Sequence, residues 1–210
     1  MAAAKPRIGL DFDNTIVCYD GIFHRAALEQ DLIPADLPLN KESVRNFLRK
    51  VGREDDWTCL QGYVYGSRMS DADPFPGLLD FLRMAKEQGL QVCIISHKTK
   101  TPYRGPSYDL HAAALEWMEA QRFFDPGVGG LDRKNVYLEL TKQAKLQRIG
   151  TTGCEIFIDD LPEFLSEPNF PETTKRVLFS PSNTPEHDPR WRPVQSWSEF
   201  GAFVKACYGF

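Results

Sequence analysis

The stretch Ile8-Gly9-Leu10-Asp11-Phe12-Asp13-Asn14-Thr15 decides the fold, because an apolar run ends in two carboxylates one residue apart. A short buried strand that delivers acidic side chains to its carboxyl end is typical of an open α/β sheet. Alternate side chains of an extended segment point the same way, so Asp11 and Asp13 start on one side of the backbone. A cation or a retained proton would offset their repulsion. An Asp-x-Asp turn that caps a helix has the same pattern, and the stretch alone leaves both interpretations open.

Composition limits the class of protein. The 210 residues are 42% hydrophobic, which is enough for one good-sized core with a small appended subdomain. A formal net charge of -4 without a long basic block argues against nucleic-acid binding. The first residues form no apolar run of signal-peptide length and no window approaches a membrane span, so we expect a cytoplasmic protein that does not bind membranes. The five cysteines and four histidines are dispersed, which disfavours zinc and histidine-ligated metal sites.

Short apolar segments alternate with amphipathic ones along most of the chain. This alternation predicts an α/β fold with a Rossmann-like, doubly wound parallel sheet, whose strand ends meet at one crevice. The expected strands are 7–10, 90–95, 135–140, 155–158 and 176–179, and the expected helices between and after them are 78–88, 108–124, 142–149 and 197–207.

Residues 16–75 interrupt this pattern. The segment is rich in charge and aromatic residues, with helical periodicity near 23–30 and 42–51. It is too long for a loop, so we interpret it as a small helical cap inserted in a core domain made of 1–15 and 76–210. The insertion closes with the group Trp57, Tyr63, Tyr65, Arg68 and Met69. These residues could line a pocket, but a cluster of aromatic side chains in a small subdomain fits its core better.

Polar side chains follow three of the predicted strands. Asp11 and Asp13 follow the first, Ser96 the second and Asp159-Asp160 the fourth. Carboxylates are the hard oxygen ligands that Mg²⁺ prefers, and a hydroxyl beside backbone amides can bind a phosphate oxygen. The loop after Ser96 adds Lys98, Lys100 and Arg104, which fit either a solvated loop or substrate contact. These residue types together point to phosphoryl chemistry.

The arrangement resembles the haloacid dehalogenase (HAD) superfamily of aspartate-nucleophile phosphatases. The resemblance rests on Asp11-Phe12-Asp13-Asn14-Thr15 as DxDx(T/V), on Ser96, on a lysine before the fourth strand, and on Asp159-Asp160 after it. The four motifs occur in the family's order between residues 8 and 160. The longer DDxxxD form is not met, because Phe164 stands at its last acidic position; Glu163, beside it, is either its substitute or an exposed helix acid.

The resemblance implies a role for each matched residue. Asp11 would attack phosphorus, while Asp13 would protonate the leaving oxygen and then activate water. Mg²⁺ would be held by Asp11, by the backbone carbonyl of Asp13 and by the acidic pair, with Asp160 favoured as ligand and Asp159 as support. Lys145 is preferred as the catalytic lysine over Lys142, with Lys98 as a third candidate. The predicted substrate-binding residues are Thr15, Ser96, His97, Lys98, Lys100 and Arg104.

Asp13 further narrows the expected reaction. Dehalogenases and phosphonate hydrolases of this superfamily lack the second aspartate, so a phosphate monoester is the expected substrate. A cap over the crevice would suit a small metabolite, such as a sugar phosphate, a nucleotide or a phospho-acid. Two alternatives remain open at this point: a phosphomutase or phosphotransferase with the same motifs, and a binding module on the same fold that has lost turnover.

Overall fold

The computed structural model describes residues 5–182 and 188–210, and it divides into two compact units. The first comprises the chain up to Ile16, together with Pro74–His97 and Arg122–Phe210; the second comprises Val17–Asp73 and Lys98–Gln121. The second unit therefore includes 98–121, a segment that the sequence pattern places in the core domain. No helix in the described ranges is both long and apolar enough to cross a membrane.

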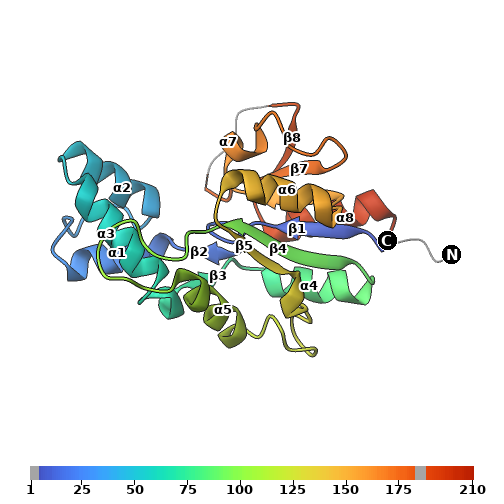
Figure 1. The fold of residues 1–210 in the computed structure, drawn as a ribbon, viewed down its shortest axis with the longest axis horizontal. Coiled ribbons are helices and arrows are strands. Elements are labelled where there is room, and N and C mark those ends of the chain that lie inside the picture. Colours follow the sequence, from blue (N-terminus) through green and yellow to red (C-terminus); the bar gives the residue numbers. More distant parts are fainter. Residues whose placement is uncertain (1–4, 183–187) are drawn as a thin grey trace. The chain divides into compact units, whose positions relative to one another are not determined.

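A six-stranded sheet forms the centre of the first unit, in the order β5-β4-β1-β6-β7-β8 (Figure 1). All five pairings are parallel, which confirms the predicted Rossmann-like α/β fold class. The strands are β1 (Arg7–Leu10), β4 (Gln91–His97), β5 (Val136–Glu139), β6 (Ile156–Asp159), β7 (Lys175–Phe179) and β8 (Trp191–Val194). Strand β8 was not predicted, because Arg192 and Pro193 interrupt its apolar pattern on an edge strand.

The register of the sheet brings the predicted strand ends together. Strand β1 lies between β4 and β6, with Leu10 opposite both Ile94 and Ile158. Asp11 therefore leaves the sheet beside the end of β6, and Ser96 lies two residues further along β4 than Ile94. Neighbouring parallel strands thus bring the acidic pair, Asp11 and Ser96 to the same side of the sheet, where the carboxyl ends of the strands lie.

Gly9 allows the sheet to be covered closely at β1. A Cβ atom at this position would lie 2.5 Å from Cδ2 of Phe157 and 2.9 Å from Sγ of Cys154. Both neighbours are buried and belong to an apolar cluster that also includes Leu146 and Ile149. The glycine is therefore part of how the core packs over the first strand.

Helices of the first unit pack on the sheet. They are α4 (Leu78–Glu87), α6 (Lys142–Thr152), α7 (Pro162–Leu165) and α8 (Trp197–Tyr208), with the 3₁₀ turn η2 (Arg133–Asn135) before β5. Thr141 caps the start of helix α6, where its hydroxyl accepts a hydrogen bond from the amide of Ala144, and Gly153 follows the helix in the left-handed conformation. Its buried face consists of Lys145, Leu146 and Ile149, so one lysine shares the apolar side of the helix.

The second unit is helical. It contains α1 (Asp20–Glu29), α2 (Lys41–Lys50), α3 (Glu54–Tyr65), η1 (Met69–Asp71) and α5 (Leu110–Ala120), and the short strands β2 (Val17–Cys18) and β3 (Asp73–Pro74) pair at the points where the insertion begins and ends. Trp57 and Met69 are buried, as expected for core residues, whereas Tyr63, Tyr65 and Arg68 are half-buried. Helix α5 is shorter than the predicted 108–124, and Arg122, just after it, has a positive φ of 62°.

Candidate active site

Asp11 is the first residue after β1, and it is buried. Its amide donates to the carbonyl of Ile158 in the neighbouring strand at 2.9 Å, which holds its backbone against β6. Helix α1 begins only at Asp20, so Asp11 and Asp13 do not cap a helix. Residues 12–16, which include Asp13, form a tight turn that is closed by a hydrogen bond from the amide of Ile16 to the carbonyl of Phe12 at 3.0 Å, with Asn14 at a φ of 57°.

Lys145 links Asp11 to the acidic pair. Its ammonium group donates to Oδ1 of Asp11 and to Oδ2 of Asp159, both at 2.6 Å, and all three residues are buried. The ammonium nitrogen also lies over the aromatic rings of Phe157 and Phe164, 5.5 Å and 4.1 Å from their centres. Phe164, which replaces the last acid of the longer family motif, therefore packs on the lysine that the acids bind.

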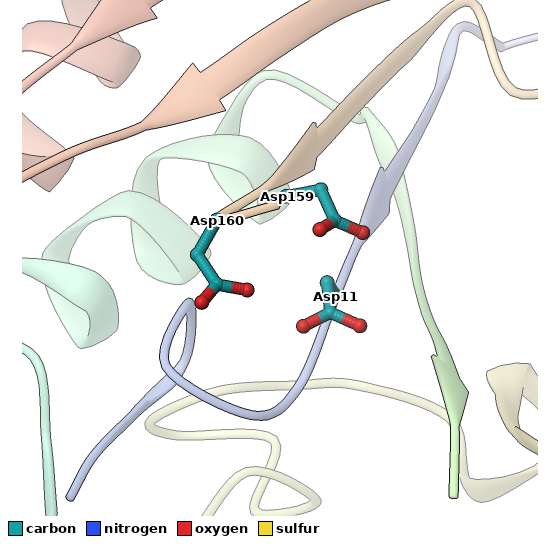
Figure 2. A group of neighbouring side chains, drawn as sticks. All are labelled: Asp11, Asp159 and Asp160. Carbon is teal, nitrogen blue, oxygen red and sulfur yellow. The ribbon is translucent and has the colours of Figure 1, made fainter. Parts of the chain in front are cut away.

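Asp11, Asp159 and Asp160 form a carboxylate cluster (Figure 2), in which one oxygen of each lies within 4.8 Å of the others. Oδ2 of Asp159 accepts a hydrogen bond from Lys145, and its Oδ1 accepts one from the amide of Leu161 at 2.9 Å, so both carboxylate oxygens have protein donors. Asp160 is half-exposed. The geometry thus distinguishes a fully enclosed acid from one that is accessible at the edge of the cluster.

Burial dominates the electrostatics of Asp11. Burial raises the pKa of this carboxyl group from 3.8 to about 7, with Lys145 opposing the rise and Asp159 adding to it. For Lys145, burial alone would lower the pKa, but the two carboxylates outweigh it and raise the pKa above its usual value. Lys145 binds two of the three clustered carboxylates, and hard oxygen donors that outnumber the ammonium group fit a divalent cation such as Mg²⁺.

Thr15 lies in the turn after the acids and is wholly buried. Its carbonyl accepts the indole N–H of Trp197 at 3.2 Å, while its Oγ1 has no hydrogen-bond partner within the described ranges. Asp13, two residues earlier, is half-buried. A buried hydroxyl with unused hydrogen-bonding capacity beside this turn is compatible with binding a polar ligand.

Ser96 and His97 occupy the end of β4. Ser96 is buried and lies opposite Leu138 of β5, and His97 is half-buried opposite Glu139. Burial, followed by the positive charge of Lys145, lowers the pKa of His97, so the imidazole is neutral at physiological pH. The structure thus places Ser96 and His97 at the same edge of the sheet as Asp11.

The remaining predicted lysines and arginine are distributed over both units. Lys98, Lys100 and Arg104 belong to the second unit, where Lys98 is buried, Lys100 is exposed and Arg104 forms an ion pair with Asp55. Lys142 is exposed at the start of α6, with Nζ 3.6 Å from a carboxylate oxygen of Glu167. The structure therefore brings Lys145, and not Lys142, to Asp11. Glu163 is exposed.

Comparisons with known proteins address the fold. No family model and no curated protein matches the sequence. A HAD family hydrolase from Deinococcus radiodurans R1, solved with bound phosphate and sodium, superimposes with a TM-score of 0.59 at 13% identity, covering 98% of this chain and 97% of the other. The chain has the haloacid dehalogenase fold. A HAD-superfamily hydrolase from Ehrlichia chaffeensis gives a TM-score of 0.57 at 13% identity, covering 98% of this chain and 100% of the other.

Structures with the HAD fold carry more than one activity. An L-2-haloacid dehalogenase also superimposes on the chain, with a TM-score of 0.57 at 11% identity, covering 97% of this chain and 100% of the other. The fold is thus common to a dehalogenase and to other HAD hydrolases, so the reaction has to be argued from the side chains at the carboxyl ends of the strands.

Proposed function

We propose that the chain is a Mg²⁺-dependent phosphatase of the HAD superfamily that hydrolyses a small phosphate monoester. The observation that carries the proposal is the contact of Lys145 with both Asp11 and Asp159 at 2.6 Å, beside the accessible carboxylate of Asp160. A buried nucleophile, a lysine that orients it and oxygen ligands for a cation are the parts that phosphoryl transfer needs.

In the proposed first step, Asp11 attacks phosphorus. Lys145 engages Oδ1 of Asp11, so we assign the attack to Oδ2. The new bond joins Oδ2 to phosphorus while the ester bond breaks, and Asp13 gives its proton to the departing oxygen. Asp13 then takes a proton from water, which attacks phosphorus, releases phosphate and restores the Asp11 carboxylate. Lys145 keeps Asp11 oriented and partly neutralised through both steps.

The cluster supports a role for Mg²⁺. Asp11, Asp160 and the backbone carbonyl of Asp13 would hold the ion, with Asp159 in support because both of its oxygens already have protein donors. The ion would supply positive charge that offsets the repulsion between the Asp11 carboxylate and the phosphate. Ser96, Thr15 and His97 would bind phosphate oxygens, and Lys98, Lys100 and Arg104 would attract the anionic substrate.

Asp13 favours phosphatase over dehalogenase activity. A halide leaves without needing a proton, whereas an alkoxide leaving group requires a general acid. The turn that places Asp13 two residues beyond the nucleophile therefore suits a phosphate ester. The proposed substrate is a small phosphorylated metabolite: a sugar phosphate, a nucleotide or a phospho-acid.

Hydrolysis of p-nitrophenyl phosphate in the presence of Mg²⁺ tests the proposal. We expect wild type to release p-nitrophenol and the Asp11→Asn variant to lose at least about a thousandfold in rate, because a carboxamide is no nucleophile. Equal rates in the two proteins would refute the mechanism. Binding of phosphorylated compounds without turnover of any of them would point to a binding module.

A further inference from the structure

Lys145 has a third partner besides the two acids, the aromatic ring of Phe164. Its ammonium nitrogen lies 4.1 Å from the centre of that ring, within the range of cation–π attraction. An ammonium group has three N–H bonds, and two of them donate to Asp11 and Asp159. No third acceptor oxygen contacts the group in residues 5–182 and 188–210. The Phe164 ring therefore adds to the attraction that holds this buried charge in place.

The ring itself is fixed by its surroundings. Phe164 is buried, and its ring centre lies 5.9 Å from that of Phe170 and 6.1 Å from that of Phe157, both of them buried as well. In the turn before α7, the amide of Phe164 donates to the carbonyl of Leu161 at 3.1 Å. The amide of Leu161 in turn donates to Oδ1 of Asp159 at 2.9 Å. One short turn after β6 thus supplies both a carboxylate and an aromatic ring to the same lysine.

The partners of Lys145 respond differently to the proposed reaction. When Oδ2 of Asp11 bonds to phosphorus, Oδ1 changes from a charged carboxylate oxygen into the neutral carbonyl oxygen of an acyl phosphate, whereas Asp159 keeps its charge. Because a charged acceptor forms a stronger hydrogen bond than a neutral one, the ammonium group is then drawn from Asp11 toward Asp159. The ring of Phe164 is uncharged, so its attraction for the ammonium group is the same in both states.

From this arrangement we infer that Phe164 is a positioning residue of the proposed reaction. Its ring holds the ammonium group of Lys145 against Asp11 while the charge of Asp11 is lost and restored. The inference rests on the proposed phosphatase function. Lys145 stabilises the reacting carboxylate only while it stays on Oδ1, so loss of the ring should slow turnover and leave substrate binding nearly unchanged.

Fluorinated phenylalanines at position 164 test the inference. Fluorine withdraws electrons from the ring and weakens its attraction for a cation, while the side chain keeps nearly the same shape. For p-nitrophenyl phosphate we expect kcat to fall with each added fluorine, by about 10-fold to 30-fold for a trifluorinated ring, with KM within about twofold of wild type. A purely structural ring would give the same kcat throughout the series, and that result would overturn the inference.

A second pair of variants controls for packing. Phe164→Leu should lower kcat by the same factor of about 10 to 30. Phe170→Leu is the matched control, because it removes a ring from the same buried cluster, and the cation over that ring is the guanidinium of Arg176 at 4.5 Å. It should keep kcat within about twofold of wild type. Equal losses of kcat in the two variants would indicate a general packing effect and overturn the inference.

A separate result would identify failure of the phosphatase proposal. If wild type hydrolyses neither p-nitrophenyl phosphate nor any sugar phosphate or nucleotide, the proposed reaction is refuted. A double-mutant cycle of Phe164→Leu and Lys145→Met, measured by urea unfolding in EDTA, then tests the contact itself. Coupling of about tenfold in the unfolding equilibrium constant would support the hold of the ring on Lys145. Additive effects, or equal coupling in a cycle with Phe170→Leu, would overturn it.

Discussion

Replacing Asp11 with asparagine should remove activity and yet stabilise the protein when Mg²⁺ is chelated. A carboxyl group whose pKa rises from 3.8 to about 7 on folding costs the folded state up to about 4 kcal/mol when ionised, at about 1.36 kcal/mol per pKa unit. Between these two pKa values the folded protein binds more protons than the unfolded chain, so the free energy of unfolding falls as pH rises through this window. Asparagine has no charge to bury and lacks this penalty.

Urea unfolding in EDTA at pH 5 and pH 8 measures the effect. From the same pKa values, Asp11→Asn should gain at most about 4 kcal/mol over wild type at pH 8 and about 1.5 kcal/mol at pH 5. Asp80→Asn, at an exposed carboxylate of α4 whose side chain is 78% accessible, should change stability by less than about 0.5 kcal/mol at both pH values. A variant less stable than wild type at pH 8, or a gain independent of pH, would show that the attraction of Lys145 outweighs burial.

Three further substitutions test other parts of the structure. Lys145→Met leaves Asp11 and Asp159 buried without their cation and should lower the free energy of unfolding in urea by about 3 to 5 kcal/mol. Lys142→Met, at an exposed site, should lower it by less than about 0.5 kcal/mol. Equal losses in the two variants would contradict the ion-pair assignment. Gly9→Ala should cost about 1 to 3 kcal/mol because its Cβ meets Phe157 and Cys154. Gly150→Ala, whose Cβ would lie an ordinary 3.5 Å from Pro171, should be neutral or stabilising; no difference between the two would refute the packing argument. Asp160→Asn should weaken Mg²⁺ binding at least about tenfold, which would appear as a smaller Mg²⁺-induced rise in Tm. The control variant Glu163→Gln should leave that rise unchanged. An unaltered rise in Asp160→Asn would exclude Asp160 as a ligand.

The main sheet could be predicted from the sequence because buried parallel strands are short apolar runs bounded by turns and helices. Strand β8 lacks that signal, since an edge strand with Arg192 and Pro193 buries little of its surface. Helix α3 begins with Glu54, Asp55 and Asp56 and carries aromatic residues on several sides, so its periodicity is weak. The grouping of 98–121 with the insertion depends on close packing against Gly62 and Gly66, which involves residues far apart in the chain.

The candidate site was predictable where a motif fixes both residue type and position. These residues, Asp11, Asp13, Ser96 and the Asp159-Asp160 pair, all lie at or just after the carboxyl ends of strands, so their approach could be inferred from the topology alone. The choice between Lys145 and Lys142 depends on which side of α6 faces the sheet, and the two residues lie only three positions apart.

The central claim is that Asp11 becomes phosphorylated, and trapping that intermediate tests it most directly. The Asp13→Asn variant should still react with p-nitrophenyl phosphate, whose leaving group needs no proton, but should be slow to activate water for the second step. Rapid quenching, borohydride reduction and peptide mass spectrometry should then locate one reduced aspartate, at residue 11. Turnover without any modification of Asp11, or modification of another carboxylate, would contradict the account.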